Sequence, residues 1–421
     1  MLIHQTSADV MFAAYVGIDW ADEKHAVCML EGTGQIEQAL DHSPEAIAAW
    51  ADALRRRFDG RMVAVALEQS RGALIYALMQ YEHLMLFPVN PTQLARYREA
   101  LSVSGKKDDP GDAHLLARFL RDHRDCLRAW KPDNVQTREL ARLCELRRDI
   151  VDARKKTIQQ LIASLKQYYP QALQLAGELH KPLALELLRR WPTLKQLQRA
   201  HPGSLRKFFR QYGHRDDEKI NALVQSIRGF QPLTKDDAVI RPSALYVGLL
   251  IKQIEQFNQA VSSFEEQIAK RFAEHPDAEV FRSLPGSGPA LAPRLLTAFG
   301  TDRERLQMAA ELQSYVGIAP VTVRSGKFCR VQRRYACPKF LRQTFHEFAD
   351  QARRWSKWSK AYYQLLRDRG KKHHAAVRAL AFKWIRIIFR MWKTRTPYDE
   401  SKYLESLKKN GSPIIKLLET T

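Results

Sequence analysis

Acidic residues are scarce relative to basic ones in this chain of 421 residues. Lys and Arg number 68 against 46 Asp and Glu, which gives a formal net charge of +22. A charge this positive argues against an ordinary metabolic enzyme and indicates a polyanionic partner, with nucleic acid as the first choice and acidic lipid as the second. The excess is greatest from Pro276 onward, where 29 Lys and Arg face 12 Asp and Glu. We therefore expect the C-terminal region to make most of the contacts with the polyanion.

Cysteine motifs and long apolar runs are also missing. The five cysteines are odd in number and show no CxxC or zinc-finger spacing, so they are expected to be reduced thiols. No apolar run is long enough to span a bilayer, and the stretch MLIHQTSADVMFAAYVG has no basic segment followed by a long apolar core. These features predict a soluble, cytoplasmic protein.

The first 131 residues have the pattern of an α/β domain. Short apolar or alternating segments, such as YVGI at 15–18 and MVAVALE at 62–68, are separated by helix-like segments such as SPEAIAAWADALRRRF at 43–58. The predicted order is β, β, α, β, α, β. That alternation indicates a sheet covered by helices.

After Pro132 the sequence changes to long helical segments with two apolar stripes at coiled-coil spacing. The stronger stripe comprises Val247, Leu250, Ile254, Phe257, Val261, Phe264 and Ile268, and the weaker comprises Leu140, Cys144, Val151, Ile158, Leu161, Leu165 and Tyr168. The stripes suit either an antiparallel coiled-coil arm or a dimerisation element. A Pro-punctuated helical segment near 170–241 is predicted to be an insertion at the tip of the arm.

A third region is predicted to be mainly helical and starts with FRSLPGSGPALAPRLLTAFG. Its PGSG, residues 285–288, separates two helical segments like the turn of a helix-hairpin-helix. The backbone N–H groups of Gly286 and Gly288 could approach a phosphate there, or the turn could simply pack the two helices. The predicted domains are therefore 1–131, 132–275 and 276–421.

Four carboxylates occupy positions that suit metal binding. Asp19 and Glu68 end two predicted strands, and Asp109 and Asp112 lie three residues apart at the start of a predicted helix. Oxygen ligands gathered without histidine or thiol favour Mg²⁺ or Mn²⁺ over zinc, and such ions support phosphodiester transfer. Each residue also has a plainer interpretation as a turn residue, a solvated strand end or a helix cap.

The order of several motifs resembles the DEDD transposases of insertion-sequence family 110. The N-terminal motifs are YVGIDWADEKHAV, ALEQSRGA, LFPVNPTQLARYREA and KKDDPGDAHLLARFL, and the C-terminal ones are LPGSGPALAPRLLTAFG, LQSYVGIAP and RSGKF. The resemblance implies a RuvC-like, RNase H-like α/β domain, a helical coiled-coil arm, and a C-terminal transposase domain. It also implies a bacterial or archaeal protein.

The resemblance also implies roles for individual residues. Asp19, Glu68, Asp109 and Asp112 would be the DEDD metal ligands, with Asp108 blurring the choice of the third, and Ser325 would be the recombination nucleophile. Arg324, Lys327 and Arg330 beside the serine could neutralise a scissile phosphate. On sequence alone the SG dipeptide would be an ordinary turn.

The function implied is that of an RNA-guided DNA recombinase and transposase. Its partners would be donor and target DNA, a structured non-coding bridge RNA, and further copies of the same chain as a dimer or a dimer of dimers. One alternative is a RuvC-like junction endonuclease that uses metal-activated water and forms no covalent intermediate. A second is a non-catalytic nucleic-acid scaffold, which would bind with a steep salt dependence and cut nothing.

Overall fold

The computed structural model describes residues 11–68, 72–101, 109–326 and 328–419. By its internal contacts the chain separates into two compact units, Met1–Pro132 and Asp133–Thr421. Among the described helices, none combines the length and apolar character that a membrane span requires. The described cysteines form no disulfide.

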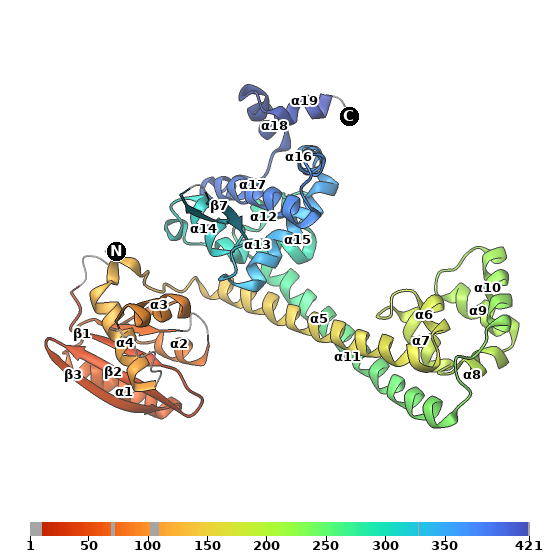
Figure 1. The fold of residues 1–421 in the computed structure, drawn as a ribbon, viewed down its shortest axis with the longest axis horizontal. Helices are drawn as coiled ribbons and strands as arrows, with labels where there is room; N and C mark the ends of the chain where they lie inside the picture. Colours follow the sequence, from red (N-terminus) through yellow and green to blue (C-terminus); the bar gives the residue numbers. More distant parts are fainter. Residues whose placement is uncertain (1–10, 69–71, 102–108, 327, 420–421) are drawn as a thin grey trace. The chain divides into compact units, whose positions relative to one another are not determined.

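The N-terminal unit is a mixed sheet with helices on both faces (Figure 1). Its strands are β1 (Ala14–Asp19), β2 (Lys24–Glu31), β3 (Gly34–Asp41), β4 (Val63–Leu67) and β5 (Leu84–Pro88). Its helices are α1 (Pro44–Arg57), α2 (Ala73–Leu78), α3 (Pro91–Leu101) and α4 (Asp109–Asp122), followed by the 3-10 turn η2 (Arg124–Cys126). The strand order is β3-β2-β1-β4-β5, with β1 antiparallel to β2 and parallel to β4. This mixed α/β sheet fits the RuvC-like prediction.

Strand β3 is absent from the predicted order, which therefore needs a correction. Its sequence GQIEQALD buries only Leu40, because β3 is an edge strand with most side chains in solvent. A strand without a buried face lacks the alternation by which strands are predicted. It pairs antiparallel with β2 along its whole length.

Helix α4 lies directly on β1, and the close approach depends on Gly17. A Cβ atom built on Gly17 would come within 2.0 Å of the Ala113 carbonyl oxygen and 2.5 Å of the Ala117 nitrogen. Ala113 and Ala117 pack there with Cys28 from β2. Glycine on the strand and alanines on the helix therefore fix the first turns of α4 beside the end of β1.

In the second unit two long helices, α5 (Val135–Tyr168) and α11 (Asp237–Ala273), run side by side (Figure 1). Asn134 caps α5 by accepting from the Thr137 amide, and Asp236 caps α11 by accepting from the Ala238 amide. Most residues of the two predicted stripes are buried. The helices thus pair within one chain, as in the predicted antiparallel arm.

Two hydrophobic cores form at opposite ends of the α5–α11 pair. The first joins the ends near Leu161 and Leu250 to the predicted insertion, which folds as five short helices. These are α6 (Gln171–Ala176), α7 (Pro182–Arg190), α8 (Leu194–Arg199), α9 (Pro202–Gln211) and α10 (Asp217–Gly229). The second joins the ends near Leu140 and Phe272 to the C-terminal region. Because the arm and the C-terminal region share this core, they belong to one compact unit.

The C-terminal region is mainly helical and carries one exposed β-hairpin. Its helices are α12 (Ala278–Arg282), α13 (Gly288–Phe299), η3 (Arg303–Arg305), α14 (Ala309–Tyr315), α15 (Lys339–Trp355), α16 (Lys357–Asp368), α17 (His373–Thr394), α18 (Glu400–Lys409) and α19 (Pro413–Glu419). The hairpin consists of β6 (Val321–Ser325) and β7 (Phe328–Gln332). Helix α17 contributes the fully buried Trp384 and Trp392 to the core that the region shares with the arm.

Candidate active site

Asp19 and Glu68 lie at the same level on neighbouring strands. Ile18 of β1 pairs with Leu67 of the parallel strand β4, so the next residue of each chain segment is a carboxylate. Asp19 follows Gly17 by two residues and therefore lies on the face of the sheet that α4 covers. Both residues are half-buried. The strand pairing thus brings two of the four predicted ligands to one edge of the sheet.

The other two predicted ligands occupy the first turn of α4. Asp109 is the first residue of the helix and is exposed, whereas Asp112 is 4% exposed. Acidic side chains in a first turn are favoured by the helix dipole. Asp112 directly precedes Ala113, which touches Gly17 on β1, so its backbone lies beside the strand that ends in Asp19.

A basic residue that the sequence did not single out accompanies Asp112. The Arg98 guanidinium from α3 donates to the Asp112 carboxylate, and both side chains are largely buried. Arg98 lies in the ARYREA stretch, where nothing in the spacing separates it from the neighbouring arginine Arg96. Only the packing of α3 against α4 identifies it.

The full set of four does not gather into a metal site in the described part of the chain. Within those ranges no three His, Cys, Asp or Glu side chains are placed to hold one ion together. Glu68 borders residues 69–71 and Asp109 borders residues 102–108, which lie outside the described ranges, as does Asp108. The donor set is nevertheless of the right type, since carboxylates alone suit Mg²⁺ or Mn²⁺. The ligand set therefore stays a prediction.

Two histidines hold the turn that follows Asp19. The Ala21 amide donates to His25 Nδ1 at 3.1 Å, and His25 Nε2 lies 2.9 Å from His42 Nδ1. Because Nδ1 accepts, Nε2 must carry the proton and donate to His42. Burial, and secondarily the charge of His42, lowers the pKa of His25. The two hydrogen bonds thus hold the β1–β2 turn, with His25 in its neutral form; we call this pair the His25 clamp.

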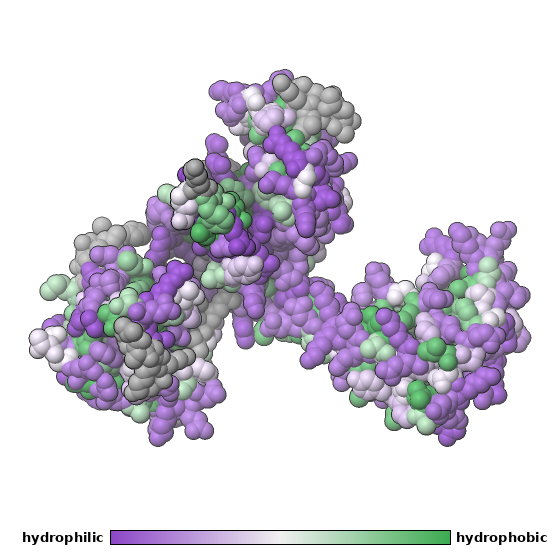
Figure 2. Space-filling model, viewed as in Figure 1, coloured by the Kyte–Doolittle hydropathy of each residue, from purple (hydrophilic) through white to green (hydrophobic). Residues whose placement is uncertain are grey.

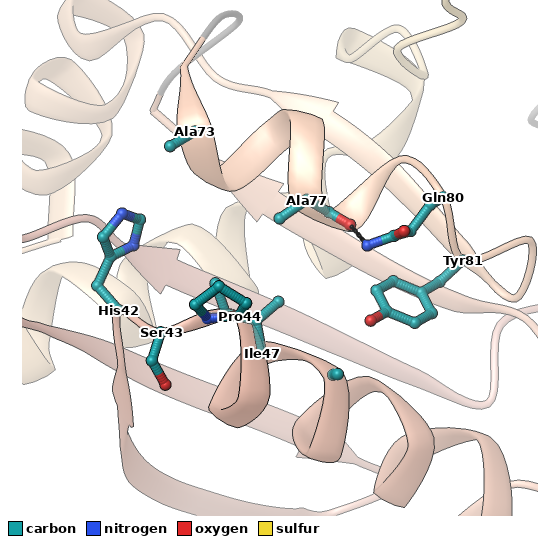
Figure 3. Close-up of a pocket in the computed structure, with 9 residues that line it drawn as sticks. His42, Ser43, Pro44, Ile47, Ala73, Ala77, Gln80 and Tyr81 are labelled. Atoms are coloured by element: carbon teal, nitrogen blue, oxygen red, sulfur yellow. Dashed lines mark hydrogen bonds between the residues drawn. The ribbon is translucent and has the colours of Figure 1, made fainter.

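A pocket of the N-terminal unit lies on the other face of the sheet, between α1 and α2. Its volume is about 520 Å³. In Figure 3, Pro44 and Ile47 of α1 face Ala73 and Ala77 of α2, with His42 at one end. Its other lining residues are Ser43, Ala48, Gln80 and Tyr81. None of the predicted ligands lines it, so we assign it no part in the chemistry.

Ser325 ends strand β6 in the C-terminal unit and is exposed. It pairs with Phe328 across the hairpin, and Val323 pairs with Arg330. Cross-strand partners and residues two positions apart share a face, so Ser325, Phe328 and Arg330 lie on one side of the hairpin. Arg324 pairs with Cys329 and lies on the opposite side. Lys327 lies outside the described residues.

The PGSG turn joins α12 to α13 and packs against α15. Gly286 has a φ of +74°, and a Cβ there would lie 2.7 Å from Trp355 Cδ1. Gly288 has a φ of +54°, with open space where its Cβ would be. Gly286 therefore serves packing, while Gly288 is the position that leaves backbone accessible. Among the aromatics nearby, Trp355 is 72% exposed and Trp358 is fully buried.

Comparison with known proteins decides the family. A model of DEDD transposases of the IS110 type matches residues 16–170, and a model of the transposase IS116/IS110/IS902 family matches residues 278–364. A Streptomyces coelicolor protein named as a mini-circle putative transposase for IS117 is 30% identical over 400 residues, covering 92% of this chain and 96% of that protein. The chain belongs to the IS110 family of transposases.

Two further relatives extend over nearly the same length. The 42 kDa protein of insertion element IS900 from Mycobacterium paratuberculosis is 26% identical over 91% of this chain and 96% of its own. The 43.6 kDa protein of insertion element IS110 from Streptomyces coelicolor is 25% identical over 91% of this chain and 95% of its own. Membership of this family makes the chain an enzyme that cuts and rejoins DNA in transposition. DEDD transposases typically depend on a divalent metal.

Proposed function

We propose that this IS110-family transposase is an RNA-guided DNA recombinase that joins DNA to Ser325. The observation that carries the proposal is that parallel pairing places Asp19 and Glu68 level on neighbouring strands, with the first turns of α4 packed on β1 beside them. In a transposase, such a carboxylate edge suits the binding of a metal that engages a phosphodiester.

Asp19, Glu68, Asp109 and Asp112 would together hold Mg²⁺ or Mn²⁺. When bound, the ion would neutralise charge on the scissile phosphate and its leaving oxygen. Asp112 now accepts from Arg98, so its carboxylate would exchange an ion pair for a metal bond. The His25 clamp would hold the residues after Asp19 in place during that exchange.

Ser325 would supply the nucleophile. Its Oγ would lose its proton and form a bond to phosphorus as one phosphorus–oxygen bond of the DNA strand breaks, and the departing sugar oxygen would take up a proton, so that no net proton is gained or lost. Arg330, on the same side of the hairpin, could stabilise charge on the phosphate. The phosphoserine keeps the phosphoester, so an incoming DNA hydroxyl could reverse the step and rejoin the strand without an outside energy source. Arg324, Lys327 and Gly288 would contact the backbone of the nucleic acid, and Gly286 would hold the PGSG turn against α15.

The proposed partners are donor and target DNA, a bridge RNA and a second copy of the chain. The RNA is proposed from the family resemblance, and its test is whether a structured non-coding RNA copurifies with the protein. The second copy has a further observation in its favour. Leu245, Tyr246 and Leu249 of α11 are 79%, 43% and 51% exposed although they lie on a helix pair. An apolar helix face of this kind favours association.

The deciding experiment uses the Ser325→Ala variant. Incubated with DNA, guide RNA and Mg²⁺, the wild-type protein is expected to form a protein–DNA adduct that survives denaturing electrophoresis, and the variant none. An adduct that persists in the variant contradicts the serine assignment. Cleavage by both proteins without any adduct would favour the junction endonuclease, in which water replaces the serine.

A further inference from the structure

The predicted insertion contains a long stretch without a single acidic residue. Between Leu187 and Arg215 the sequence has eight Lys and Arg and no Asp or Glu. The stretch covers the end of α7, all of α8 and α9, and the loop that follows. The chain as a whole is basic enough to be soluble without this stretch. Its eight positive charges therefore need another explanation.

The fold turns these basic side chains to the solvent. Helices α8 and α9 bury Leu194, Leu197, Leu205, Phe208 and Phe209 in the core at this end of the arm. What remains exposed is Lys195 and Arg199 from α8, Arg206, Lys207 and Arg210 from α9, and Arg215 after it. We call these six residues the arm-tip basic face. Hydrophilic residues make up most of the visible face of the α6–α10 cluster in Figure 2.

Most of this charge is not neutralised within the chain. Arg210 pairs with Asp217 at 2.6 Å, and Arg206 donates to the Asn221 amide oxygen at 2.8 Å. The neighbouring Arg189 and Arg190 are held by Glu186. By contrast, Lys195, Arg199 and Lys207 make no ion pair with any carboxylate in the described ranges. Arg215 makes none either, so four charges remain available to a ligand.

The backbone beneath the basic face is firmly held. Arg228 of α10 donates to the carbonyl oxygens of Gln198 and Ala200, and the Gln198 amide donates to the Phe230 carbonyl at 2.8 Å. These bonds join the end of α8 to the end of α10. A surface built on tied helices presents its charges in a fixed arrangement, which lowers the entropy cost of binding.

The side chains around the basic residues indicate which class of polyanion this surface suits. Large apolar or aromatic side chains that are mostly exposed do not occur between Val135 and Leu233. Binding of single strands relies on aromatic side chains that stack with bases, and membrane binding relies on an apolar face that enters the bilayer. A basic surface without either feature is suited to the phosphate backbone of a duplex.

We propose that the arm-tip basic face binds the phosphate backbone of a double-stranded nucleic acid. The 34 residues of α5 span about 50 Å, so this binding surface lies far along the arm from the C-terminal core. The inference rests on the proposed function only in taking nucleic acid as the partner. The duplex is either DNA beyond the exchanged site or a stem of the guide RNA, since both offer the same phosphates.

The test compares two triple variants of the full chain. The first, Lys195→Ala/Arg199→Ala/Lys207→Ala, removes the three unpaired charges that lie on α8 and α9 and leaves Arg215 in place. The control, Lys181→Ala/Lys235→Ala/Arg241→Ala, removes the same number of exposed charges of the same kinds from the same part of the arm, where Lys181 and Arg241 already pair with carboxylates. Circular dichroism checks that both variants fold.

Binding is measured by fluorescence anisotropy over a salt series, with a DNA duplex and an RNA hairpin of unrelated sequence as probes. The first variant is expected to lower the slope of log K against log salt by about 0.9 for each DNA phosphate that the protein no longer neutralises, whereas the control keeps the wild-type slope.

A reduced slope on the DNA probe alone assigns the face to flanking DNA, and a reduced slope on the hairpin alone assigns it to a guide stem. Equal slopes for both variants on both probes overturn the proposal. The assay measures binding and neither strand cleavage nor adduct formation, so failure of the serine chemistry is a separate result.

Discussion

The ion pair between Arg98 and Asp112 sets the charge balance at the edge of the sheet. The two side chains are only 17% and 5% exposed, so little water solvates either charge. If Asp112 is a metal ligand, Arg98 serves as its counter-charge whenever no metal is bound. The same carboxylate would then be stabilised by either of two cations.

The Arg98→Met variant tests this exchange. Leaving a buried carboxylate without a partner is expected to cost about 3–5 kcal/mol of stability. Adding Mn²⁺ should raise the melting temperature of the variant more than that of the wild type, because the ion replaces the missing charge. Arg57→Met is the control, since Arg57 and Glu31 are 45% and 41% exposed, and such a pair contributes about 0–1 kcal/mol. A variant that Mn²⁺ does not rescue would count against Asp112 as a ligand.

His25 predicts how the N-terminal unit responds to acid. Its lowered pKa means that below about pH 6.5 the unfolded chain binds a proton that the folded chain does not. Stability should therefore fall as pH drops below that value. His25→Asn keeps an acceptor for the Ala21 amide but cannot titrate, so thermal unfolding between about pH 7 and pH 5 should show a shallower decline than in the wild type. Parallel pH profiles would rule out His25 as the source.

At the scale of elements, the helices and strands that can be predicted from the sequence are those with at least one buried face. The β1 and β4 strands and the stripes on α5 and α11 all bury one face or more, and that burial creates the periodicity from which they are inferred. Strand β3 escapes prediction because its pairing with β2 depends on backbone hydrogen bonds, which leave no mark in the side-chain pattern.

The candidate site is predictable to a similar extent. Asp19 and Glu68 can be placed because strand ends are visible in sequence, and parallel pairing brings them level. Arg98 and the His25–His42 clamp cannot, because their partners are 14 and 17 residues away and meet only through packing. The roles of the serine and its neighbours rest on family resemblance and stay predictions.

The β6–β7 hairpin is almost wholly exposed, and two strands alone are marginally stable in water. Phe328 is 60% exposed on the side of Ser325, while Val331 is 63% exposed on the other side. If the chemistry takes place on the serine side, Phe328 must be covered when DNA is bound. Because the two side chains are exposed to nearly the same extent, Val331 can serve as the control for Phe328.

Phe328→Ala and Val331→Ala should therefore differ in their effect on the formation of the protein–DNA adduct. Both side chains are exposed, so neither change should shift stability by more than about 0.5 kcal/mol. Phe328→Ala is expected to reduce the yield of protein–DNA adduct, and Val331→Ala to leave it near the wild-type level. Adduct formation on denaturing gels and thermal unfolding provide the two measurements. Equal reductions would mean that the serine side of the hairpin has no special part in binding DNA.

At the scale of the whole molecule, the distribution of polar and apolar surface suggests different tasks for parts of the arm. The α8–α9 surface is basic and lacks large exposed apolar groups, whereas α11 exposes Leu245 and Leu249 one helical turn apart. The first is suited to nucleic acid and the second to another protein surface. A second copy of this chain is the partner that the family resemblance implies.

Acidic substitutions on the apolar face of α11 should therefore dissociate the proposed dimer. Leu245→Glu/Leu249→Glu is expected to halve the mass measured by light scattering, because two carboxylates would have to be buried in the interface. Leu233→Glu is the control, since Leu233 is 60% exposed but lies outside the helix.

If Ser325 of one copy acts with the carboxylates of another, the double variant should keep duplex binding and form no DNA adduct. A variant that is monomeric and still forms the adduct would show that one chain supplies the whole site, and an unchanged mass would place the interface elsewhere.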